Sequence, residues 1–319
     1  MEQRRVVVVG YDQAELLDIA CVTTSLITAN RLGASPAYAV DVATPGGRAV
    51  TCEAGLTLQG QRFLERVKGP LDTMIVSGGL GHEAAADSPL IIGHIRRLAR
   101  ESRRVASVCT GATVLAAAGL LDGKRATTHW SYAQQLACNY PEIDVDPAPI
   151  YIRDGRVSTA AGVTSALDLT LAFIEEDHGS ELARGVARGL VTYLHRPGNQ
   201  AQMSMFTTAP ALTNGLVRRV VDHIVGHLAG DLSATALAAY AGVSERHLTR
   251  LFIDQLGQAP GRFVRNARTE AAAQLLASTS LPMARVAARC GFGSAETLRQ
   301  AFAGRYGTSP SRYRATQST

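Results

Sequence analysis

Residues 282–302 read PMARVAARCGFGSAETLRQAF and predict a helix, a tight turn and a second helix. Gly291 and Gly293 interrupt the helical pattern at a point where a turn needs unusual backbone angles. Ser294 then stands at the position of a helix N-cap. The apolar residues of the second helix, four apart on one face, are Leu298 and Phe302. This pattern is typical of a helix-turn-helix whose second helix can enter the DNA major groove.

The same pattern occurs a second time upstream. Residues 236–252 read ALAAYAGVSERHLTRLF, in which Leu248 and Phe252 correspond to Leu298 and Phe302. Each copy is followed by a similar tail, with Gly257, Pro260 and Phe263 after the first and Gly307, Pro310 and Tyr313 after the second. A repeat at a fixed period indicates two copies of one structural unit. A helical solenoid needs more than two copies, so the repeat favours DNA binding.

Charge is unevenly distributed along the 319 residues. The formal net charge is +5, but residues 212–319 contain 13 Arg and no Lys against 6 Asp and Glu, a net +7. The preceding residues carry a net charge of −2. A basic region beside a near-neutral one is expected of a nucleic-acid binder with a separate second module. A solvated basic surface would show the same excess, so the charge is supporting evidence for the repeat.

Residues 214–315, about a third of the chain, resemble the DNA-binding domain of the AraC family of transcription regulators. The resemblance implies a domain that contains only helices and binds DNA sequence-specifically. This chain departs from the family pattern at Gln300, where many members have Arg. The most specific matching residues all lie in the second copy: Gly291, Phe292, Ser294, Phe302, Gly307, Ser309, Pro310, Tyr313 and Arg314.

The recognition helices implied by this resemblance are about 244–252 and 294–302, placed in successive major-groove turns on one face of the DNA. Arg in such a helix can read guanine or hold phosphate, and Glu or Gln can pair with base edges. The candidate DNA-binding residues are Ser244, Arg246, His247, Thr249 and Arg250 in the first helix, Ser294, Glu296, Thr297, Arg299 and Gln300 in the second, and Arg312 and Arg314 for phosphate.

Strands and helices alternate through the first 190 or so residues. Residues 5–10, RVVVVG, form a β-branched apolar run that closes on Gly, which is typical of a strand buried on both faces of a parallel sheet. The alternation predicts an α/β domain with a mostly parallel, flavodoxin-like sheet flanked by helices. Further strands are expected at 38–43, 73–77 and 105–108 and near Ile150 and Val157, and helices at 14–31, 89–101, 111–120, 164–176 and 181–195.

The segment 107–112, SVCTGA, contains the strongest candidate for a reactive group in this half. A buried strand leads directly into Cys109, and a Gly-containing helix start follows, as in a nucleophile elbow with its strained turn. A thiol at a helix N-terminus is expected to have a lowered pKa, which favours the thiolate. A free Cys also often only packs, because it is among the most buried residue types.

Three further features are expected to line a pocket around this thiol. The Gly78-Gly79 turn follows a buried strand and could offer backbone N–H groups to an oxyanion. Asp18 on the first helix could reach the thiol from the side, although it could equally be a packing carboxylate. His129, in the run TTHW, could be a lining residue or only a structural one. The predicted pocket residues are Asp18, Gly78, Gly79, Cys109, Thr110 and His129.

The first 190 or so residues resemble the PfpI/ThiJ-like branch of the class I glutamine amidotransferase-like superfamily. The matching positions are Asp18, the Gly78-Gly79 turn, Cys109 and residues 118–130. Protease and amidase members commonly have His directly after the elbow Cys, where this chain has Thr110, and this counts against peptidase or amidase chemistry. The Cys-Thr-Gly pattern with an acidic residue in the first helix is similar to isonitrile hydratases, in which the Cys attacks the isonitrile carbon and the carboxylate handles protons.

The combination of the two regions resembles a subgroup of AraC-type regulators whose N-terminal domain serves sensing and dimerisation. Three alternatives for the elbow stay open: hydratase activity, an inert Cys109 in a dimerisation scaffold, and a thiol redox sensor. The expected limits are 1–199 for the N-terminal domain, 200–211 for a linker and 212–319 for the DNA-binding domain. The expected partners are double-stranded operator DNA, a second copy of the chain, a small effector such as a nitrogen-containing metabolite, and RNA polymerase.

Composition excludes other classes of protein. No apolar run reaches the roughly 18 residues that span a bilayer, and no signal-peptide cleavage site follows the first apolar run. The 5 Cys residues are odd in number, scattered and not in metal-binding spacing, which indicates a reducing cytosol and no disulfide framework. We therefore expect a cytoplasmic protein that does not contact membranes and binds no metal or cofactor.

Overall fold

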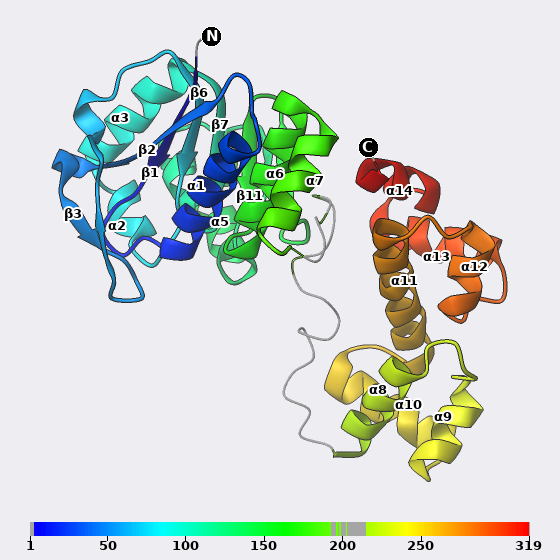
Figure 1. Ribbon diagram of the computed structural model, residues 1–319. Helices are drawn as coiled ribbons and strands as arrows, with labels where there is room; N and C mark the ends of the chain where they lie inside the picture. Colours follow the sequence, from blue (N-terminus) through cyan, green and yellow to red (C-terminus); the bar gives the residue numbers. More distant parts are fainter. Residues whose placement is uncertain (1–2, 193–195, 197, 199–201, 203–214, 319) are drawn as a thin grey trace. The chain divides into compact units, whose positions relative to one another are not determined.

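The computed structural model describes residues 3–192, 196, 198, 202 and 215–318 (Figure 1). The chain divides into two compact units, Met1–Gln202 and Met203–Thr319, and each is described by itself. The expected linker, 200–211, lies outside the described residues apart from Gln202, so the expected domain limits stay predictions. Across the described part of the chain, no helix combines the length and the apolar character needed to cross a lipid bilayer.

The N-terminal unit is built on a sheet that has seven strands within the described residues, in the order β10-β11-β7-β6-β1-β2-β5. Neighbouring strands are parallel except at one edge, where β10 is antiparallel to β11. The expected mostly parallel α/β fold is therefore confirmed. The strand bounds are β1 Arg4–Val9, β2 Tyr38–Thr44, β5 Arg62–Phe63, β6 Leu71–Val76, β7 Ser102–Val108, β10 Tyr151–Asp154 and β11 Val157–Ala160.

Helices cover both faces of this sheet (Figure 1). α1, α6 and α7 pack against one another. In a second group, α3 and α4 contact β6 and β7, and α2 packs on α3 and α4. The bounds are α1 Leu16–Arg31, α2 His82–Ala86, α3 Pro89–Arg100, α4 Gly111–Ala117, α5 Ala133–Asn139, α6 Thr164–His178 and α7 Ser180–Gly189. Two short strand pairs were not expected from the sequence: β3 Ala49–Thr51 with β4 Thr57–Gln59, and β8 Arg125–Ala126 with β9 Asp144–Val145.

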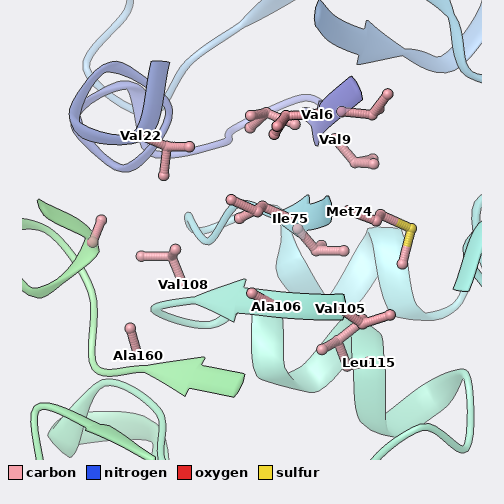
Figure 2. Close-up of a cluster of buried hydrophobic side chains, with 14 of the residues drawn as sticks. Val6, Val9, Val22, Met74, Ile75, Val105, Ala106, Val108, Leu115 and Ala160 are labelled. Atoms are coloured by element: carbon pink, nitrogen blue, oxygen red, sulfur yellow. The ribbon is translucent and has the colours of Figure 1, made fainter. Parts of the chain in front are cut away.

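The core of this unit lies between the central strands and the helices (Figure 2). Residues Val6 to Val9 of β1 are at most 3% exposed, because β1 lies between β2 and β6 and is covered on both faces. Val22 from α1 and Leu115 from α4 are buried against the strands, together with Ile75 of β6. Burial on both faces explains why the central strands are continuous apolar runs.

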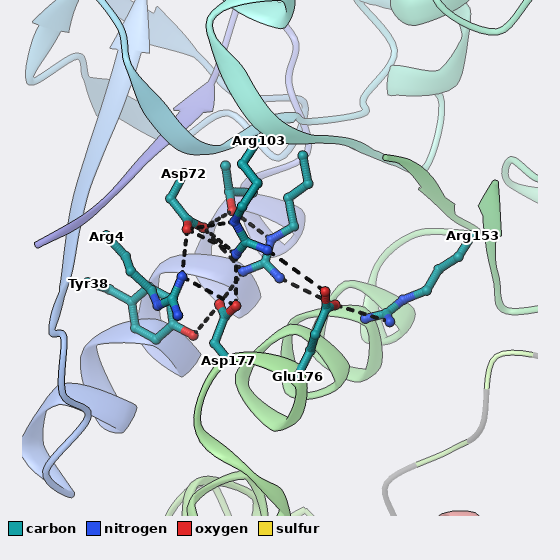
Figure 3. Close-up of polar contacts among 9 residues, drawn as sticks. Arg4, Tyr38, Asp72, Arg103, Arg153, Glu176 and Asp177 are labelled. Atoms are coloured by element: carbon teal, nitrogen blue, oxygen red, sulfur yellow. Dashed lines mark hydrogen bonds and ion pairs between the residues drawn. The ribbon is translucent and has the colours of Figure 1, made fainter. Parts of the chain in front are cut away.

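A network of charged side chains closes the amino ends of the central strands (Figure 3). Arg4 at the start of β1 donates to Asp72 at the start of β6, at 2.8 Å. Arg103 donates to Asp177, near the end of α6, at 2.8 Å, and Arg104 pairs with the same carboxylate. The network ties the C-terminal end of α6 to the sheet, at the end of the strands away from the elbow.

Helix α7 ends earlier than the expected limit at His195. It ends at Gly189, and Val191 has a left-handed backbone with φ +55°, which is incompatible with a continuing helix. The last part of the expected helix, 193–195, lies outside the described residues.

The C-terminal unit contains only helices within its described residues, as expected (Figure 1). α9 and α10 form the first helix-turn-helix, and α12 and α13 form the second. The long helix α11 joins them. The bounds are α8 Gly215–Gly226, α9 Ala234–Ala241, α10 Glu245–Leu256, α11 Pro260–Ser278, α12 Met283–Arg289, α13 Ala295–Tyr306 and α14 Pro310–Ser318.

The two copies of the repeat agree in detail. α10 and α13 each end at a glycine with left-handed backbone angles, Gly257 with φ +65° and Gly307 with φ +64°. A buried ring of the next helix then meets the last fully buried Phe of α10 or α13 edge-on. The ring centroids are 5.8 Å apart for Phe252 and Phe263, and 5.1 Å apart for Phe302 and Tyr313. The repeated Gly-Pro-aromatic tail therefore closes each unit.

The expectation of unusual backbone angles in the turn of the second helix-turn-helix is confirmed for Gly291 and not for Gly293. Gly291 has a left-handed backbone, with φ +78°, but Gly293 is not among the residues with positive φ. α12 ends at Arg289, so a single left-handed residue reverses the chain before the N-cap of α13. Ser294 is that N-cap, because its hydroxyl accepts a hydrogen bond from the backbone of Thr297 at 3.1 Å.

Gly304 inside α13 and Gly307 directly after it provide a matched test of how this helix ends. An added Cβ meets no atom within 4 Å at Gly304 or at Gly307, but only Gly307 has left-handed φ. We expect Gly304→Ala to stabilise the second unit by roughly 0.5–1 kcal/mol, because Gly is unfavourable inside a helix. Gly307→Ala should destabilise it by about 1 kcal/mol, because an L-residue is strained there. Urea unfolding followed by circular dichroism measures both, and equal signs would contradict the account.

Candidate functional site

Cys109 stands in a strained turn between β7 and α4. Its φ is +54°, which confirms the expected elbow conformation. Its backbone N–H donates to Ala160 at 2.9 Å, and its carbonyl accepts from Thr128 Oγ1 at 2.9 Å. These two bonds hold the strained residue between β11 and the segment after β8.

Glycines form close walls around this side chain. A Cβ on Gly78 would lie 2.4 Å from the Cys109 Cβ, and a Cβ on Gly162 would lie 2.8 Å from the Cys109 Sγ. Real Cβ atoms do not approach so closely, so the elbow fits only where these positions lack a side chain. Gly162, two residues after the end of β11, was not predicted from the sequence, although a glycine so soon after a buried strand could have pointed to it.

Asp18 and Thr110 lie beside the thiol and bond to the neighbouring loops. Asp18 is 1% exposed, and its two carboxylate oxygens accept from the backbone N–H of Gly78 at 3.1 Å and of Val163 at 2.7 Å. The Thr110 hydroxyl accepts from the Gly79 N–H and donates to the Gly79 carbonyl, each at 2.9 Å. The N–H groups of Gly78 and Gly79 are therefore already occupied, and the expectation that they serve an oxyanion is wrong.

The expectation of a thiolate is also wrong. Burial raises the pKa of the Cys109 thiol to about 12, the nearby Asp18 carboxylate raises it further, and hydrogen bonds with Thr110 only partly oppose this. The dipole of the short helix α4 does not compensate for removal from water beside a negative charge. At neutral pH Cys109 is a thiol.

The Asp18 carboxyl has a pKa raised to about 7. Burial is the main cause, the backbone bonds from Val163 and Gly78 oppose it, and the negative charges of Glu15 and Glu53 add to it. A carboxyl with a pKa in this range carries its proton in part of the molecules near neutral pH. Glu15 and Glu53 were not predicted, because only the fold brings the β3–β4 hairpin beside the start of α1.

His129 is not joined to Cys109 by any contact between these two described residues. Its Nδ1 lies 2.7 Å from the Ser131 hydroxyl, and its ring contacts are with Trp130 and Tyr132. Burial lowers its pKa. These contacts fit a structural role for His129, as the cap of a short turn, better than a role at the thiol.

The predicted DNA-binding residues lie mostly on exposed faces of α10 and α13. Leu248 and Phe252 of α10 and Leu298 and Phe302 of α13 are buried, at 1% exposure or less, so the polar residues between them face away from the core. Exposed residues from the predicted set are Ser244, Arg246, Arg250, Ser294, Glu296, Thr297, Arg299, Gln300 and Arg312, and His247 and Thr249 are partly exposed.

Several of these residues already have partners within the protein. The Ser244 hydroxyl caps α10, and Arg250 contacts His247 at 3.2 Å. Arg299 pairs with Glu296 at 2.7 Å on the solvent face of α13. Arg314 donates to the Leu281 carbonyl at 2.6 Å. A guanidinium bonded to the backbone of its own unit is suited to a structural role.

The different environments of Cys109 and Cys138 give a test of the thiol. Cys109 is buried and Cys138 is exposed in the same unit. We expect iodoacetamide at pH 7.5 to modify Cys138 much faster, because the buried Cys109 thiol remains protonated. Asp18→Asn should lower the Cys109 pKa by removing the negative charge and should speed its alkylation above pH 8. Mass spectrometry of the two peptides measures both rates, and faster modification of Cys109 than of Cys138 would contradict this account.

Two family models match the chain. A helix-turn-helix domain matches residues 237–316, and the DJ-1/PfpI family matches residues 4–176. Among solved structures, DJ-1beta of Drosophila melanogaster is similar, with a TM-score of 0.53 and 26% identity over 60% of this chain and 98% of that one. Isonitrile hydratase of Pseudomonas putida is 38% identical over 136 residues, which are 42% of this chain and 58% of the enzyme.

A relative of similar length covers both domains. The HTH-type transcriptional regulator CdhR of Pseudomonas aeruginosa is 32% identical over 290 residues, which are 91% of this chain and 85% of that protein. Within the described residues, no three His, Cys, Asp or Glu side chains gather as metal ligands would. The chain therefore belongs to the AraC-type helix-turn-helix transcriptional regulators that have an N-terminal DJ-1/PfpI-family domain.

Proposed function

We propose that α10 and α13 are the recognition helices of this regulator and that they read two adjacent elements of one DNA site. The proposal rests on one observation: the C-terminal unit contains two equivalent helix-turn-helices that share α11. In both, the second helix has a Ser N-cap and a Gly C-cap, and a buried Phe of that helix meets a ring of the next helix edge-on. The net charge of +7 over residues 212–319 supplies attraction to phosphate.

The exposed side chains divide into two roles. Arg246, Arg250 and Arg299 have the donor groups that read guanine in the major groove, and Gln300 can pair with adenine. The Arg299–Glu296 pair is on the surface, so DNA can break it at small cost. Arg312, exposed at the start of α14, is a phosphate contact. We assign no DNA contact to Arg314.

The N-terminal unit is proposed to sense a small molecule and to join two copies of the chain. A dimer doubles the number of DNA elements held at once and so raises affinity through effective concentration. As a regulator it would act in the cytoplasm on promoter DNA, with RNA polymerase as the partner that its binding helps or hinders.

The charge around the elbow indicates what kind of effector fits. The charged groups that shift the pKa values of Asp18 and Cys109 are carboxylates. Glu15 and Glu53 raise the pKa of Asp18, and Asp18 and Glu53 raise the pKa of Cys109. A buried site with this charge disfavours an anion and favours a neutral or cationic ligand. A small nitrogen compound has the required chemistry.

An isonitrile hydratase-like activity is the second candidate, since Asp18 with its pKa near 7 lies beside Cys109. The protonated thiol and the occupied N–H groups of Gly78 and Gly79 oppose it. Turnover of an alkyl isonitrile that Cys109→Ala abolishes would establish the activity. Unchanged operator binding in that variant would leave the regulator intact.

Arginine substitutions test the proposed DNA contacts. We expect Arg299→Ala to weaken specific binding by roughly 10- to 100-fold, equivalent to about 1–3 kcal/mol, with little change on random DNA. Arg312→Ala should weaken both kinds of binding and reduce the salt slope by about 1. Arg100→Ala, which removes an equal charge from α3, is the control. Titrations at several salt concentrations measure these effects, and equal losses for Arg299→Ala on specific and random DNA would contradict the assignment.

Analogues of different charge test the proposed effector class. We expect small amines or amides to raise the melting temperature of the full chain and small carboxylates of equal size to have no effect. Asp18→Asn should weaken the preference for cations, because it removes the central negative charge. Thermal shift with matched sets of cationic, neutral and anionic compounds measures this, and stabilisation by the anions alone would overturn the assignment.

A further inference from the structure

The DNA-binding domain contains two helix-turn-helix units, and each has its own hydrophobic core. The first unit of this pair is α8–α10 and the second is α12–α14. The first core contains Phe252, Phe263 and the buried face of α8, and the second contains Phe302 and Tyr313. Among the described residues, α11 alone contributes to both cores, with Val264 and Ala267 in the first and Ala272 and Leu276 in the second. In the described residues, α8–α10 make at most minor contact with α12–α14. Packing against α11 alone therefore leaves the relative position of the two units weakly determined.

One side chain of α11 binds the loop of the first unit. Arg268 donates from Nε to the Leu228 carbonyl at 2.9 Å and from Nη2 to the Gly230 carbonyl at 2.8 Å. Leu228 and Gly230 belong to the connection between α8 and α9. The two bonds use the planar fork of the guanidinium and fix both its direction and the position of the loop.

The turn of the second unit lies against the same carbonyl. A Cβ built on Gly291 would lie 2.0 Å from the Leu228 oxygen and 2.7 Å from Arg268 Nε. The backbone of Gly291 therefore lies directly against the hydrogen-bonded pair of Arg268 and Leu228. The first helix-turn-helix unit, α11 and the second helix-turn-helix unit all contribute to this contact, which we name the clamp: Leu228, Gly230, Arg268 and Gly291.

Beside the clamp the two units do not pack tightly. A cavity of about 540 Å³ lies there, lined from the first unit by residues including Ser233, from α11 by Arg265 and Val264, and from the second unit by residues including Phe292 and Thr297. Because this part of the boundary is hollow, the clamp has few neighbours that could replace it. A change at the clamp would therefore alter the angle between the units.

The repeat itself differs at this point. The left-handed residue of the first turn is Gly242, with φ +70°, and an added Cβ there meets no atom within 4 Å. In the second copy, the residue 50 positions after Gly242 is Phe292, and the left-handed residue is Gly291, one position earlier. The copies thus depart from each other where the second turn meets the first unit.

We propose that Arg268 and Gly291 are positioning residues that set the distance and angle between α10 and α13, and hence the spacing of the two DNA elements that one chain recognises. The proposal rests on the proposed function of α10 and α13. Recognition helices that enter successive major grooves must be about 34 Å apart along the DNA. Binding to both elements is then an intramolecular event, whose strength depends on that geometry.

The test uses a DNA site selected from a random pool by the wild-type chain. Affinity is measured for this site, for versions with one base pair added or removed between the two elements, and for a version with one element scrambled. Arg268→Ala and Gly291→Ala should weaken binding to the native site at least about tenfold and reduce the penalty for altered spacing. Binding to the single element should remain unchanged.

Two controls separate positioning from loss of stability. Gly242→Ala introduces the same backbone strain without a contact, and Arg305→Ala removes an ion pair with Glu270 inside the second unit. Both should lower the urea midpoint and keep the spacing preference. An unchanged spacing preference in folded Arg268→Ala and Gly291→Ala would overturn the clamp. If Arg246→Ala and Arg299→Ala also left sequence preference unchanged, the proposed function itself would have failed.

Discussion

Helix α11 is a member of two hydrophobic cores, and the arrangement of the DNA-binding unit depends on this. Each helix-turn-helix is too small to bury much apolar surface alone. A shared helix lets each complete its core with residues of α11 and with the ring that follows its own second helix, Phe263 in one and Tyr313 in the other. The same shared helix links the two proposed recognition helices, and in our proposal the Arg268 clamp adds the rotational restraint that one helix cannot supply.

The N-terminal unit shows a balance between strain, burial and charge. The left-handed Cys109 is held by backbone bonds and by the absence of side chains at Gly78 and Gly162. The same enclosure removes the thiol from water, and the Asp18 carboxylate beside it keeps the pKa of the thiol high. A site of this kind retains the backbone geometry of a catalytic elbow, but its buried thiol is held in the protonated form. This agrees with the similarity of the whole chain to a regulator and of only part of it to an enzyme.

Much of the fold could be predicted from local patterns. The β-branched run of β1, the Gly-Pro-aromatic tails and the Ser294 cap are set by neighbouring residues, and the structure confirms them. The site was harder to predict, because its properties arise from distant segments. The occupied N–H groups of Gly78 and Gly79, the carboxylates of Glu15 and Glu53 and the bond from Arg268 to Leu228 depend on long-range contacts that no spacing in the sequence reveals.

Selection of binding sites from random DNA, carried out in parallel with the wild type, Arg246→Ala and Arg299→Ala, tests the central claim most directly. If α10 and α13 each read one element, the wild type should enrich two short elements about one helical turn apart. Arg246→Ala should then relax the sequence of one element and Arg299→Ala that of the other. Enrichment of a single element, or the same altered sequence with both variants, would contradict the claim that this chain reads DNA through two recognition helices.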